Sequence, residues 1–547
     1  MTWDNATALK PSAHVDTFCR DHLPPFDQWP EMIFELAEVR YPDRLNCAVE
    51  LLTAVIARLG PDRPCLLTPT GETWTYGELE RMSNRIATVL TRDFGVVPGN
   101  RVLLRGPNNL WLAACWFAVL KAGGVVVTTM PLLRPAELTA VAEIARVDLA
   151  LCDARFVDDL RLARLGDAPV VTYDALGPGV EAVDDGFTAI DTSADDVALL
   201  AFTSGTTGRP KATMHFHRDV LAIADTFSRH LVRPRPDDIV TGTPPLAFTF
   251  GLGGLLVFPL RVGAATLLVE KATPDQLADL IARHGATVCF TAPTAYRAML
   301  RAGRPERLRS LRRAVSAGEH LPAATWHDFF QTTGVRLIDG IGSTEMLHVF
   351  ISAADDDIRP GATGRVIPGY RAAVLDDAGD PVPRGTPGRL AVKGPTGCRY
   401  LNDPRQSAYV QNGWNFTGDT YLQDEDGYFH YLARRDDMIV SSGYNIAGPE
   451  VEEALTAHPA VEECCVVGAP DPQRGQIVKA YVVLRPGTAG TPSLAAELQE
   501  FTKRQIAPYK YPRAVEFIAS LPRTSTGKVQ RYVLRAQASV PTMAEPA

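Results

Sequence analysis

Glycine, hydroxyl and lysine side chains follow an apolar stretch at 197–202 in an order that suits phosphate binding. Glycines let backbone N–H groups approach a phosphate closely, hydroxyls add donors, and a lysine adds positive charge. Because Arg209 and Pro210 precede the lysine, the loop differs from the Walker A pattern, in which Gly, Lys and Ser/Thr are adjacent. A polar turn after a strand is the alternative, but the length of the run favours a phosphate loop. Its residues are Thr203, Ser204, Gly205, Thr206, Thr207, Gly208 and Lys211.

The elements that must position this loop alternate between β-strands and α-helices, in a βαβ pattern. Between residues 45 and 150, stretches of helical period such as WLAACWFAVLKAGG alternate with short apolar strands such as RVLLRG and VVVTTM. The same alternation continues through the strand-like stretches VALLAFTS, TVCFTAP and LRRAVSAG. We therefore expect an α/β fold in which one or two mainly parallel sheets are covered by helices.

The pattern changes near Arg434. A segment of about 110 residues follows with its own strands (CCVVGAP, KAYVVLRP, AVEFIAS) and helices (PEVEEALTAH, LAAELQEFTKRQ), which is enough for a small α+β domain. The sequence therefore predicts a large N-terminal domain, residues 1–435, and a small mobile C-terminal domain, residues 436–547. The hinge is expected at Asp436, in a charged turn.

Composition excludes several classes of function. The net charge of -8 argues against a nucleic-acid partner, because binding to phosphate backbones needs a basic face. The longest apolar run, Leu110 to Leu120, is too short to span a membrane. The nine cysteines show no metal-ligand spacing, and the odd number suits no closed disulfide framework. We expect a cytoplasmic protein, and the oligomeric state is left open, with a homodimer as one candidate.

Six sequence blocks resemble the adenylate-forming superfamily of acyl-CoA synthetases, peptide-synthetase adenylation domains and luciferases. The blocks are TSGTTGRPK, SAGEHL, DGIGSTEML, WNFTGDT, ARRDDMIVSSGYNIAGPEVE and LPRTSTGKVQR, and they occur in the family's order over nearly the whole chain. The resemblance implies that ATP and a carboxylic acid form an acyl-adenylate. The acyl group then passes to coenzyme A.

The resemblance also implies roles for individual residues. Thr344 would donate to the α-phosphate and Glu345 would hold Mg²⁺, although a Thr-Glu pair taken alone suits a surface turn equally. Lys528 would be the mobile catalytic lysine, whose ammonium bridges the carboxylate and the α-phosphate. Where the family often has an aromatic residue against adenine, this chain has Ile341. The remaining residues expected around the nucleotide are Gly318, Glu319, Asp339, Gly340, Asp419 and Arg434.

The acid is expected to be aromatic. The segment PPLAFTFGLGGLLVFPL suggests a flat apolar slot, with a plain buried helix end as the alternative from pattern alone. By the resemblance, Phe248 stands where amino-acid adenylation domains carry an aspartate. An apolar ring cannot pair with an α-ammonium group, so an α-amino acid is disfavoured. The opening segment and the run from GRVIPGY to GYNIAGPEVE resemble 2-aminobenzoate (anthranilate)-CoA ligases within the benzoate-CoA ligase group. Candidate substrate residues are Phe248, Gly251, Ala317, Gly342 and His348, of which His348 also has a structural interpretation.

Coenzyme A would enter beside a Ser-Ser-Gly-Tyr segment once the small domain has turned. The expected residues are Ser442, Gly443, Tyr444 and Arg474, although Arg474 can equally be a surface arginine. The alternative function is a standalone adenylation enzyme that loads an aryl acid onto a carrier protein. The two differ in whether free coenzyme A is consumed.

Overall fold

The computed structural model describes residues 9–203, 210–434, 437–441, 444–471, 474–506, 508–523 and 528–539, with backbone only at 444 and 445. The chain divides into two compact units. The first comprises Met1–Ala372 and Ala391–Phe416, and the second comprises Ala373–Leu390 and Thr417–Ala547.

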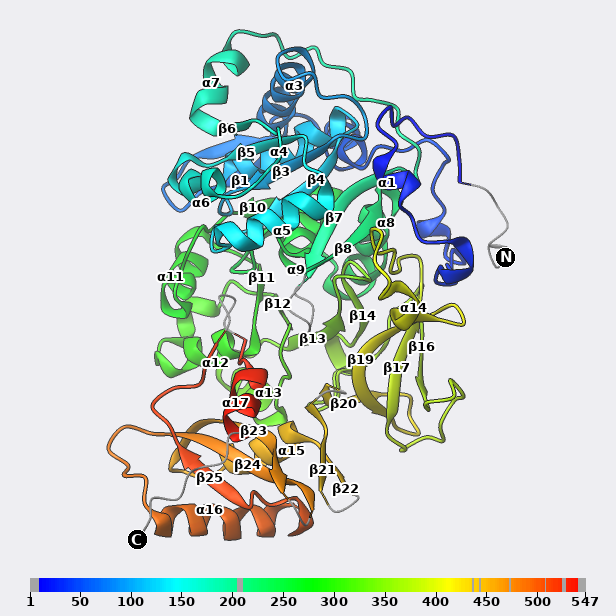
Figure 1. The fold of residues 1–547 in the computed structure, drawn as a ribbon. Coiled ribbons are helices and arrows are strands. Elements are labelled where there is room, and N and C mark those ends of the chain that lie inside the picture. Colours follow the sequence, from blue (N-terminus) through cyan, green and yellow to red (C-terminus); the bar gives the residue numbers. More distant parts are fainter. Residues whose placement is uncertain are drawn as a thin grey trace. The chain divides into compact units, whose positions relative to one another are not determined.

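A six-stranded sheet of the first unit has the order β6-β5-β3-β4-β7-β8 and is parallel except where β7 meets β8 (Figure 1). Leu138, Val141 and Leu160, from α5 and α6, pack on one face against Leu103 and Val127. Because α4 is apolar on every side, it is buried along nearly its whole length. The elements are α3 (Tyr76–Arg92), β3 (Arg101–Arg105), α4 (Leu110–Lys121), β4 (Val125–Thr129), α5 (Pro135–Ala145), β5 (Leu149–Cys152), α6 (Val157–Leu162), β6 (Val170–Thr172), α7 (Tyr173–Glu181), β7 (Val197–Thr203) and β8 (Lys211–Phe216).

A nine-stranded sheet of the same unit has the order β15-β14-β13-β12-β11-β9-β10-β1-β2. Its inner strands from β13 to β1 are parallel, and antiparallel strands close both edges. Helices α11, α12 and α13 cover one face through Ile281, Met299 and Phe329. The elements are β1 (Pro64–Leu67), β2 (Thr73–Thr75), β9 (Ile239–Gly242), β10 (Ala265–Leu267), α11 (Pro274–His284), β11 (Val288–Thr291), α12 (Pro293–Arg301), β12 (Arg313–Ala317), α13 (Ala323–Thr333), β13 (Leu337–Gly342), β14 (Val349–Ser352) and β15 (Arg365–Val366).

Local sequence signals explain where several of these helices begin and end. Helix α3 begins after Thr75, whose hydroxyl accepts from the Glu78 amide while the Glu78 carboxylate accepts from the Thr75 amide. Helix α11 begins with the same arrangement at Thr273 and Gln276. It ends at Gly285, which has φ of 62°, a conformation that glycine adopts at little cost.

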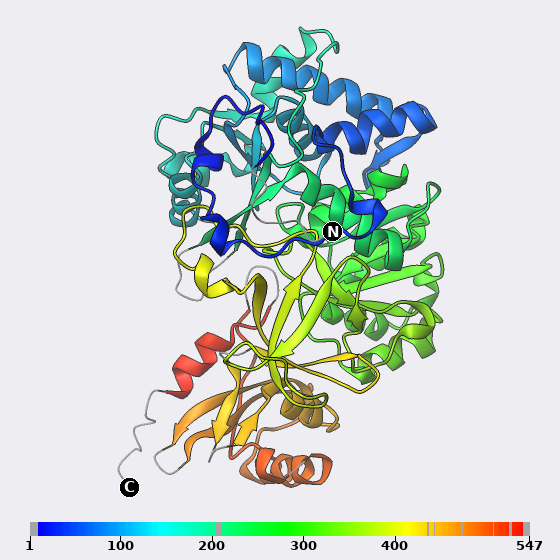
Figure 2. The same ribbon diagram turned by 90° about the vertical axis from the view of Figure 1, so that its right-hand side faces the viewer.

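The second unit contains a sheet of order β22-β21-β24-β23, with β25 paired to β24. Alternate strand residues face opposite sides, so Val466 and Val482 pack with Leu498 of α16, whereas Cys465 and Tyr481 pack with Leu534. Figures 1 and 2 accordingly show α16 and α17 on opposite faces. The elements are β21 (Ile439–Ser441), β22 (Tyr444–Ile446), α15 (Gly448–Thr456), β23 (Val461–Asp471), β24 (Gly475–Leu484), α16 (Pro492–Gln505), β25 (Ala514–Phe517) and α17 (Arg531–Ala538).

A further sheet of order β16-β17-β19-β18, with β20 on β19, contains the strands at which the chain passes from one unit to the other. Its strands are β16 (Arg371–Leu375), β17 (Gly388–Lys393), β18 (Val410–Gln411), β19 (Trp414–Gln423) and β20 (Phe429–Arg434). The predicted α/β class, with mainly parallel sheets covered by helices and a smaller α+β part near the C-terminus, is confirmed.

Candidate active site

Strand β8 carries the lysine of the predicted phosphate loop. Thr203 at the end of β7 pairs with Lys211 at the start of β8, so the loop between them connects an antiparallel pair. On the other edge of β8, the amide of Leu401 donates to the Ala212 carbonyl at 2.9 Å. Tyr400 forms a bridge with Thr213 there, so its ring lies beside the Lys211 side chain.

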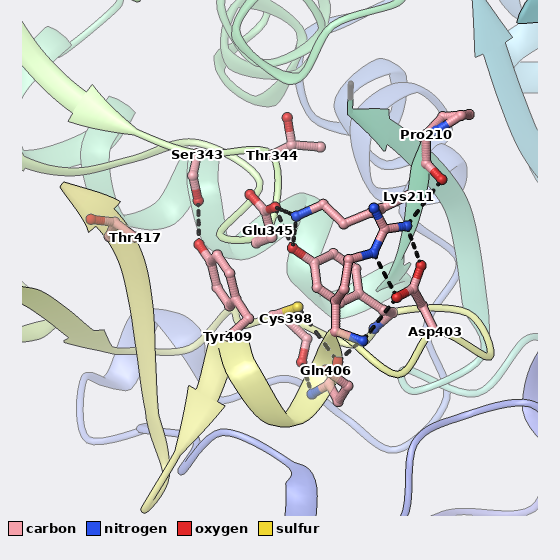
Figure 3. A network of polar contacts seen from close by, with 12 residues as sticks. Pro210, Lys211, Ser343, Thr344, Glu345, Cys398, Asp403, Gln406, Tyr409 and Thr417 are labelled. Carbon is pink, nitrogen blue, oxygen red and sulfur yellow. Dashed lines mark hydrogen bonds and ion pairs between the residues drawn. The ribbon is translucent and has the colours of Figure 1, made fainter. Parts of the chain in front are cut away.

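A network of polar contacts joins Lys211, Tyr400 and Glu345 (Figure 3). Lys211 Nζ donates to the Tyr400 hydroxyl at 2.6 Å and lies 3.3 Å from Glu345 Oε1, and the same Oε1 accepts from the Tyr400 hydroxyl at 2.5 Å. Burial and the Glu345 carboxylate hold the pKa of Tyr400 far above its usual value, so the hydroxyl stays protonated and donates. The lysine ammonium also lies 4.5 Å from the Tyr400 ring centroid. Glu345 is therefore fixed without a ligand.

The turn around Glu345 is held at several points. His215 Nε2 lies 2.8 Å from the Thr344 carbonyl oxygen, and the Ser343 hydroxyl lies 3.2 Å from the Tyr409 hydroxyl. The Met346 amide donates to the Ser343 hydroxyl at 3.2 Å. These contacts fix the backbone that presents the Thr344 hydroxyl and the Glu345 carboxylate.

A second set of polar contacts secures the segment next to β8 (Figure 3). Arg405 forms an ion pair with Asp403 and donates to the Pro210 carbonyl at 3.3 Å. The buried Gln406 accepts from the Tyr400 amide at 2.8 Å and donates to the Cys398 carbonyl at 3.2 Å. The start of β8 and the backbone at Tyr400 are thus tied to the same short segment.

Parallel pairing of β12 and β13 brings two predicted nucleotide blocks to one edge of the sheet. Ala317 pairs with Gly340, so Gly318 and Glu319 follow β12 near the end of β13. Asp339 accepts from the Ser316 hydroxyl at 2.6 Å, and burial raises the pKa of Asp339 to about 7. Ile341 is half-buried and Gly342 is exposed at this edge.

His348 lies in a cage of phenylalanine rings. Its ring centroid is 4.6 Å from that of Phe258, 5.4 Å from that of Phe227 and 5.5 Å from that of Phe250. The residue is 2% exposed, and neither ring nitrogen makes a hydrogen bond of standard geometry within the described residues, although the Phe250 backbone acts on the ring electrostatically. Desolvation lowers the pKa of His348 to about 3, so the imidazole is neutral at physiological pH.

The glycine-rich segment near His348 is helical, as in the alternative interpretation of a buried helix end. Helices α9 (Thr249–Leu252), η6 (Gly253–Val257) and α10 (Phe258–Val262) follow one another, and Phe248 stands half-buried before them. A Cβ on Gly253 would lie 2.4 Å from His348 Cδ2. A Cβ on Gly251 would lie 2.1 Å from the Pro245 carbonyl oxygen. The close approach to the glycines is therefore present, but the groups that approach them are the ring of His348 and the backbone of a loop.

In the second unit, Asp419 and Arg434 face each other across β19 and β20. Arg434 Nη1 lies 3.1 Å from Asp419 Oδ1, with Asp419 buried and Arg434 exposed. Lys528 is exposed near the bridge of Arg523 with Val529. The exposed Arg474 donates from its backbone to the Asp471 carboxylate at 2.8 Å. Pairing of Asp419 with Arg434 is thus a feature of this unit by itself.

Several predicted residues lie outside the described residues. They are Ser204, Gly205, Thr206, Thr207 and Gly208 of the phosphate loop, Asp436 of the hinge, Ser442 and Gly443, and the side chain of Tyr444.

Three residues that sequence analysis did not single out contribute to the site. Tyr400 and Tyr409 lie far from Lys211 along the chain, and no local pattern in GCRYL or in QSAYV marks them as site residues. His215 had a signal, because alternation along KATMHF places it on the same side of β8 as Lys211.

Neither a metal cluster nor a membrane span is found in the part of the chain that the structure describes. No group of three or more His, Cys, Asp or Glu side chains there could hold a metal ion. No helix there is long and apolar enough to cross a membrane. Glu345 offers a carboxylate, and Mg²⁺ is commonly held by one or two carboxylates together with substrate phosphates.

Comparison with known proteins places the chain in a family. Residues 54–399 match the family model of the AMP-binding enzyme, and residues 450–528 match that of the AMP-binding enzyme C-terminal domain. The benzoate–CoA ligase of Thauera aromatica is 34% identical over 515 residues, which are 91% of this chain and 97% of that protein. The 3-hydroxybenzoate–CoA ligase of Aromatoleum sp. (strain CIB) is 33% identical, with 90% and 96% covered.

Solved structures agree with this placement. The anthranilate CoA ligase AuaEII in complex with anthranoyl-AMP superimposes with a TM-score of 0.86 at 31% identity, covering 92% of this chain and 99% of that one. A benzoate CoA ligase from Burkholderia xenovorans LB400 superimposes with a TM-score of 0.83 at 32% identity, covering 90% and 100%. The chain therefore belongs to the AMP-binding enzyme family, within its benzoate-CoA ligase group.

Proposed function

We propose that the protein is an AMP-forming aryl-CoA ligase whose acid is 2-aminobenzoate. It activates the carboxylate with ATP as an acyl-adenylate, releases pyrophosphate, and transfers the acyl group to coenzyme A with release of AMP. The aryl-CoA ligase class is supported by the relatives that cover nearly the whole chain. The choice of acid is supported by His348.

The observation that carries this choice is the buried imidazole of His348, whose ring nitrogens make no hydrogen bond of standard geometry within the described residues. Buried polar groups in native proteins are hydrogen-bonded in the great majority of cases, and each exception needs an explanation. Three phenylalanine rings pack around His348, and half-buried Phe250 would offer its face to the flat ring of an aryl acid. A neutral imidazole has one lone pair that can accept from an ortho-amino group, whereas unsubstituted benzoate offers no donor at its ring. A ring with an amino or hydroxyl substituent therefore completes the site better than benzoate.

In the adenylation half-reaction, Lys211, the residues at the ends of β12 and β13, and the pair of Asp419 and Arg434 act on ATP. Lys211 and the loop before it bind phosphate oxygens, and Asp339, Gly340 and Ile341 bind adenine. Thr344 donates to the α-phosphate. Mg²⁺ held by Glu345 would screen the charge of the triphosphate. Asp419 and Arg434 bind the ribose, and Gly318 and Glu319 complete the nucleotide site.

In the second half-reaction, the small domain turns about Asp436 and presents a channel for pantetheine. Ser442, Gly443 and Tyr444 line this channel, and Arg474 pairs with the nucleotide end of coenzyme A. Lys528 acts in the first half-reaction, where its ammonium neutralises charge as pyrophosphate leaves.

The proposal is tested by AMP release with ATP, Mg²⁺ and coenzyme A across 2-aminobenzoate, 4-aminobenzoate, salicylate, benzoate, acetate and octanoate. The expected order has 2-aminobenzoate first, salicylate above benzoate, and the aliphatic acids last. The 4-amino isomer is the matched control, because it has the same groups with the donor displaced from the carboxylate. Preference for octanoate would refute the aryl class, whereas equal use of benzoate and 2-aminobenzoate would refute only the choice of acid. Adenylate formation without any effect of coenzyme A would indicate a carrier-protein acceptor.

A further inference from the structure

One side of β8 contacts the Thr344–Glu345 turn at two places. Lys211, Thr213 and His215 alternate along the strand and therefore point to the same side. Lys211 contacts the Glu345 carboxylate at the start of the strand, and His215 contacts the Thr344 carbonyl four residues on. The strand thus holds both the side chain and the backbone of the turn.

The contact of His215 has a defined polarity. A carbonyl oxygen can only accept, so the hydrogen of the imidazole lies on Nε2. His215 is fully buried, and desolvation lowers its pKa to about 4, so the ring donates this hydrogen bond in its neutral form. Its Nδ1 faces Asp219 Oδ2 at 3.9 Å, which is beyond hydrogen-bonding distance.

A buried ion pair fixes the surroundings of His215. Arg399 Nη1 donates to Asp219 Oδ2 at 2.8 Å, and both side chains are fully buried. The Arg399 guanidinium lies over the rings of Phe216 and Trp29, at 4.0 and 5.0 Å from their centroids. Because Arg399 directly precedes Tyr400, the ion pair anchors the segment that brings Tyr400 to Glu345.

We propose that His215 is a positioning residue for adenylation, which fixes the turn that presents Thr344 and Glu345 through its Nε2–H contact with the Thr344 carbonyl. The inference rests on the proposed function, because it assigns the turn to the reacting phosphate. His215 is fully buried and acts through the turn. Its contribution is geometric: displacement of reacting groups by about 1 Å can lower an enzymatic rate by up to 10²-fold.

The experiment compares His215→Gln with His215→Asn. The glutamine amide reaches the position of Nε2 and can donate to the Thr344 carbonyl, whereas the shorter asparagine cannot. We expect His215→Asn to lower kcat/KM for MgATP in pyrophosphate exchange by about 10-fold or more, and His215→Gln to retain activity within about threefold of wild type. The matched control is His217→Asn, which alters an equally buried histidine that contacts Cys47 instead of the turn. After correction for the folded fraction from thermal denaturation, this control stays within about twofold.

Equal losses in His215→Gln and His215→Asn, or in His215→Asn and His217→Asn, would overturn the inference, because the effect would then be one of general packing. Failure of the proposed function gives a different result, namely no pyrophosphate exchange by the wild type with any aromatic acid. In that case the dissociation constant of MgATP, measured by calorimetry, decides the question. A value raised about fivefold or more in His215→Asn alone supports the positioning role, and an unchanged value overturns it.

Discussion

The turn from Ser343 to His348 has two ends that differ in how far the protein satisfies their hydrogen-bonding groups. At one end, Glu345 is buried and its carboxylate already accepts hydrogen bonds from Tyr400 and Lys211. At the other end, His348 is buried at least as deeply, yet neither nitrogen makes a hydrogen bond of standard geometry among the described residues. One end is complete without a ligand, and in the proposed function the acid completes the other.

This difference separates the chemistry from the choice of acid. Groups that act on ATP meet the same phosphates in every turnover, so they can be positioned in advance by the protein. A group that recognises the acid must keep its hydrogen-bonding capacity for the acid. A site built to hydrogen-bond a polar group rejects an analogue that lacks that polar group. Changes at the Glu345 end should therefore affect all acids alike, and changes at the His348 end should affect their ratio.

The largest effect is expected at Lys528, where catalysis should fall without any change in acid preference. Lys528→Ala should slow adenylation by about 10²-fold or more for every acid, because one well-placed charge on the developing transition state is lost. Pyrophosphate exchange measures this step. Thioester formation from a supplied acyl-adenylate should be much less affected, and equal damage to both half-reactions would contradict the assignment. Lys503→Ala, at a surface pair with Glu500, serves as the control.

A change at His348 should instead alter the preference between acids. His348→Leu should lower the ratio of kcat/KM for 2-aminobenzoate to that for benzoate by about 10-fold, since the acceptor for the ring substituent is lost. The same substitution should raise the free energy of unfolding of the free protein by about 1 kcal/mol, because an unsatisfied buried polar group costs about 1–3 kcal/mol. Competition between the two acids and urea denaturation measure the two quantities. An unchanged ratio would remove His348 from acid recognition.

The sequence singled out Lys211 and Glu345, which the structure brings together, but not the residues that support them. Lys211 lies in a glycine- and hydroxyl-rich run whose residue types predict phosphate binding, whereas the roles of Thr344 and Glu345 come from the family resemblance. The parallel sheets followed from the alternation of apolar strands and helices, which reflects burial on both faces. Tyr400 could not be found in this way, because its contact with Lys211 depends on a backbone bridge to β8 from a distant segment.

The glycines at 251, 253 and 254 show why local pattern is insufficient. Their number suggested close approach and a flat slot, and the close approach is present. Which group approaches them is decided by tertiary packing: the His348 ring lies against Gly253 and the Phe290 ring against Gly254. Residue types alone do not distinguish a ligand ring from a protein ring.

A smaller effect is expected at Tyr400, which belongs to the end that is complete without a ligand. Tyr400→Phe removes one hydrogen bond to Glu345, and we expect the apparent affinity for MgATP to fall about five- to tenfold, equally with every acid. Tyr409→Phe is the matched comparison, because its 3.2 Å contact with Ser343 joins two neutral groups and should be worth about twofold at most. Saturation curves in MgATP with two acids measure both. A change in acid preference in Tyr400→Phe would contradict the inference that the Glu345 end affects all acids alike.

The smallest effect on activity is expected from pH. Because the pKa of His348 is lowered to about 3, its imidazole stays neutral from pH 6 to 9, and the ratio of kcat/KM for 2-aminobenzoate to that for benzoate should change less than about twofold over this range. The lowered pKa also affects stability. Below about pH 6.5 the unfolded chain takes up a proton at His348 that the folded protein does not, so folding is weakened as the pH falls. At pH 5 this amounts to about 2 kcal/mol.

His348→Leu isolates this contribution, since the other buried histidines are present in both proteins. Between pH 7 and pH 5 the wild type should lose more free energy of unfolding than the variant, by about 2 kcal/mol, as measured by urea denaturation at each pH. An equal loss in both proteins would mean that the folded protein protonates His348 as readily as the unfolded chain does. The buried imidazole would then be charged near pH 5, and the ratio of the two acids should itself fall as the pH is lowered to that value.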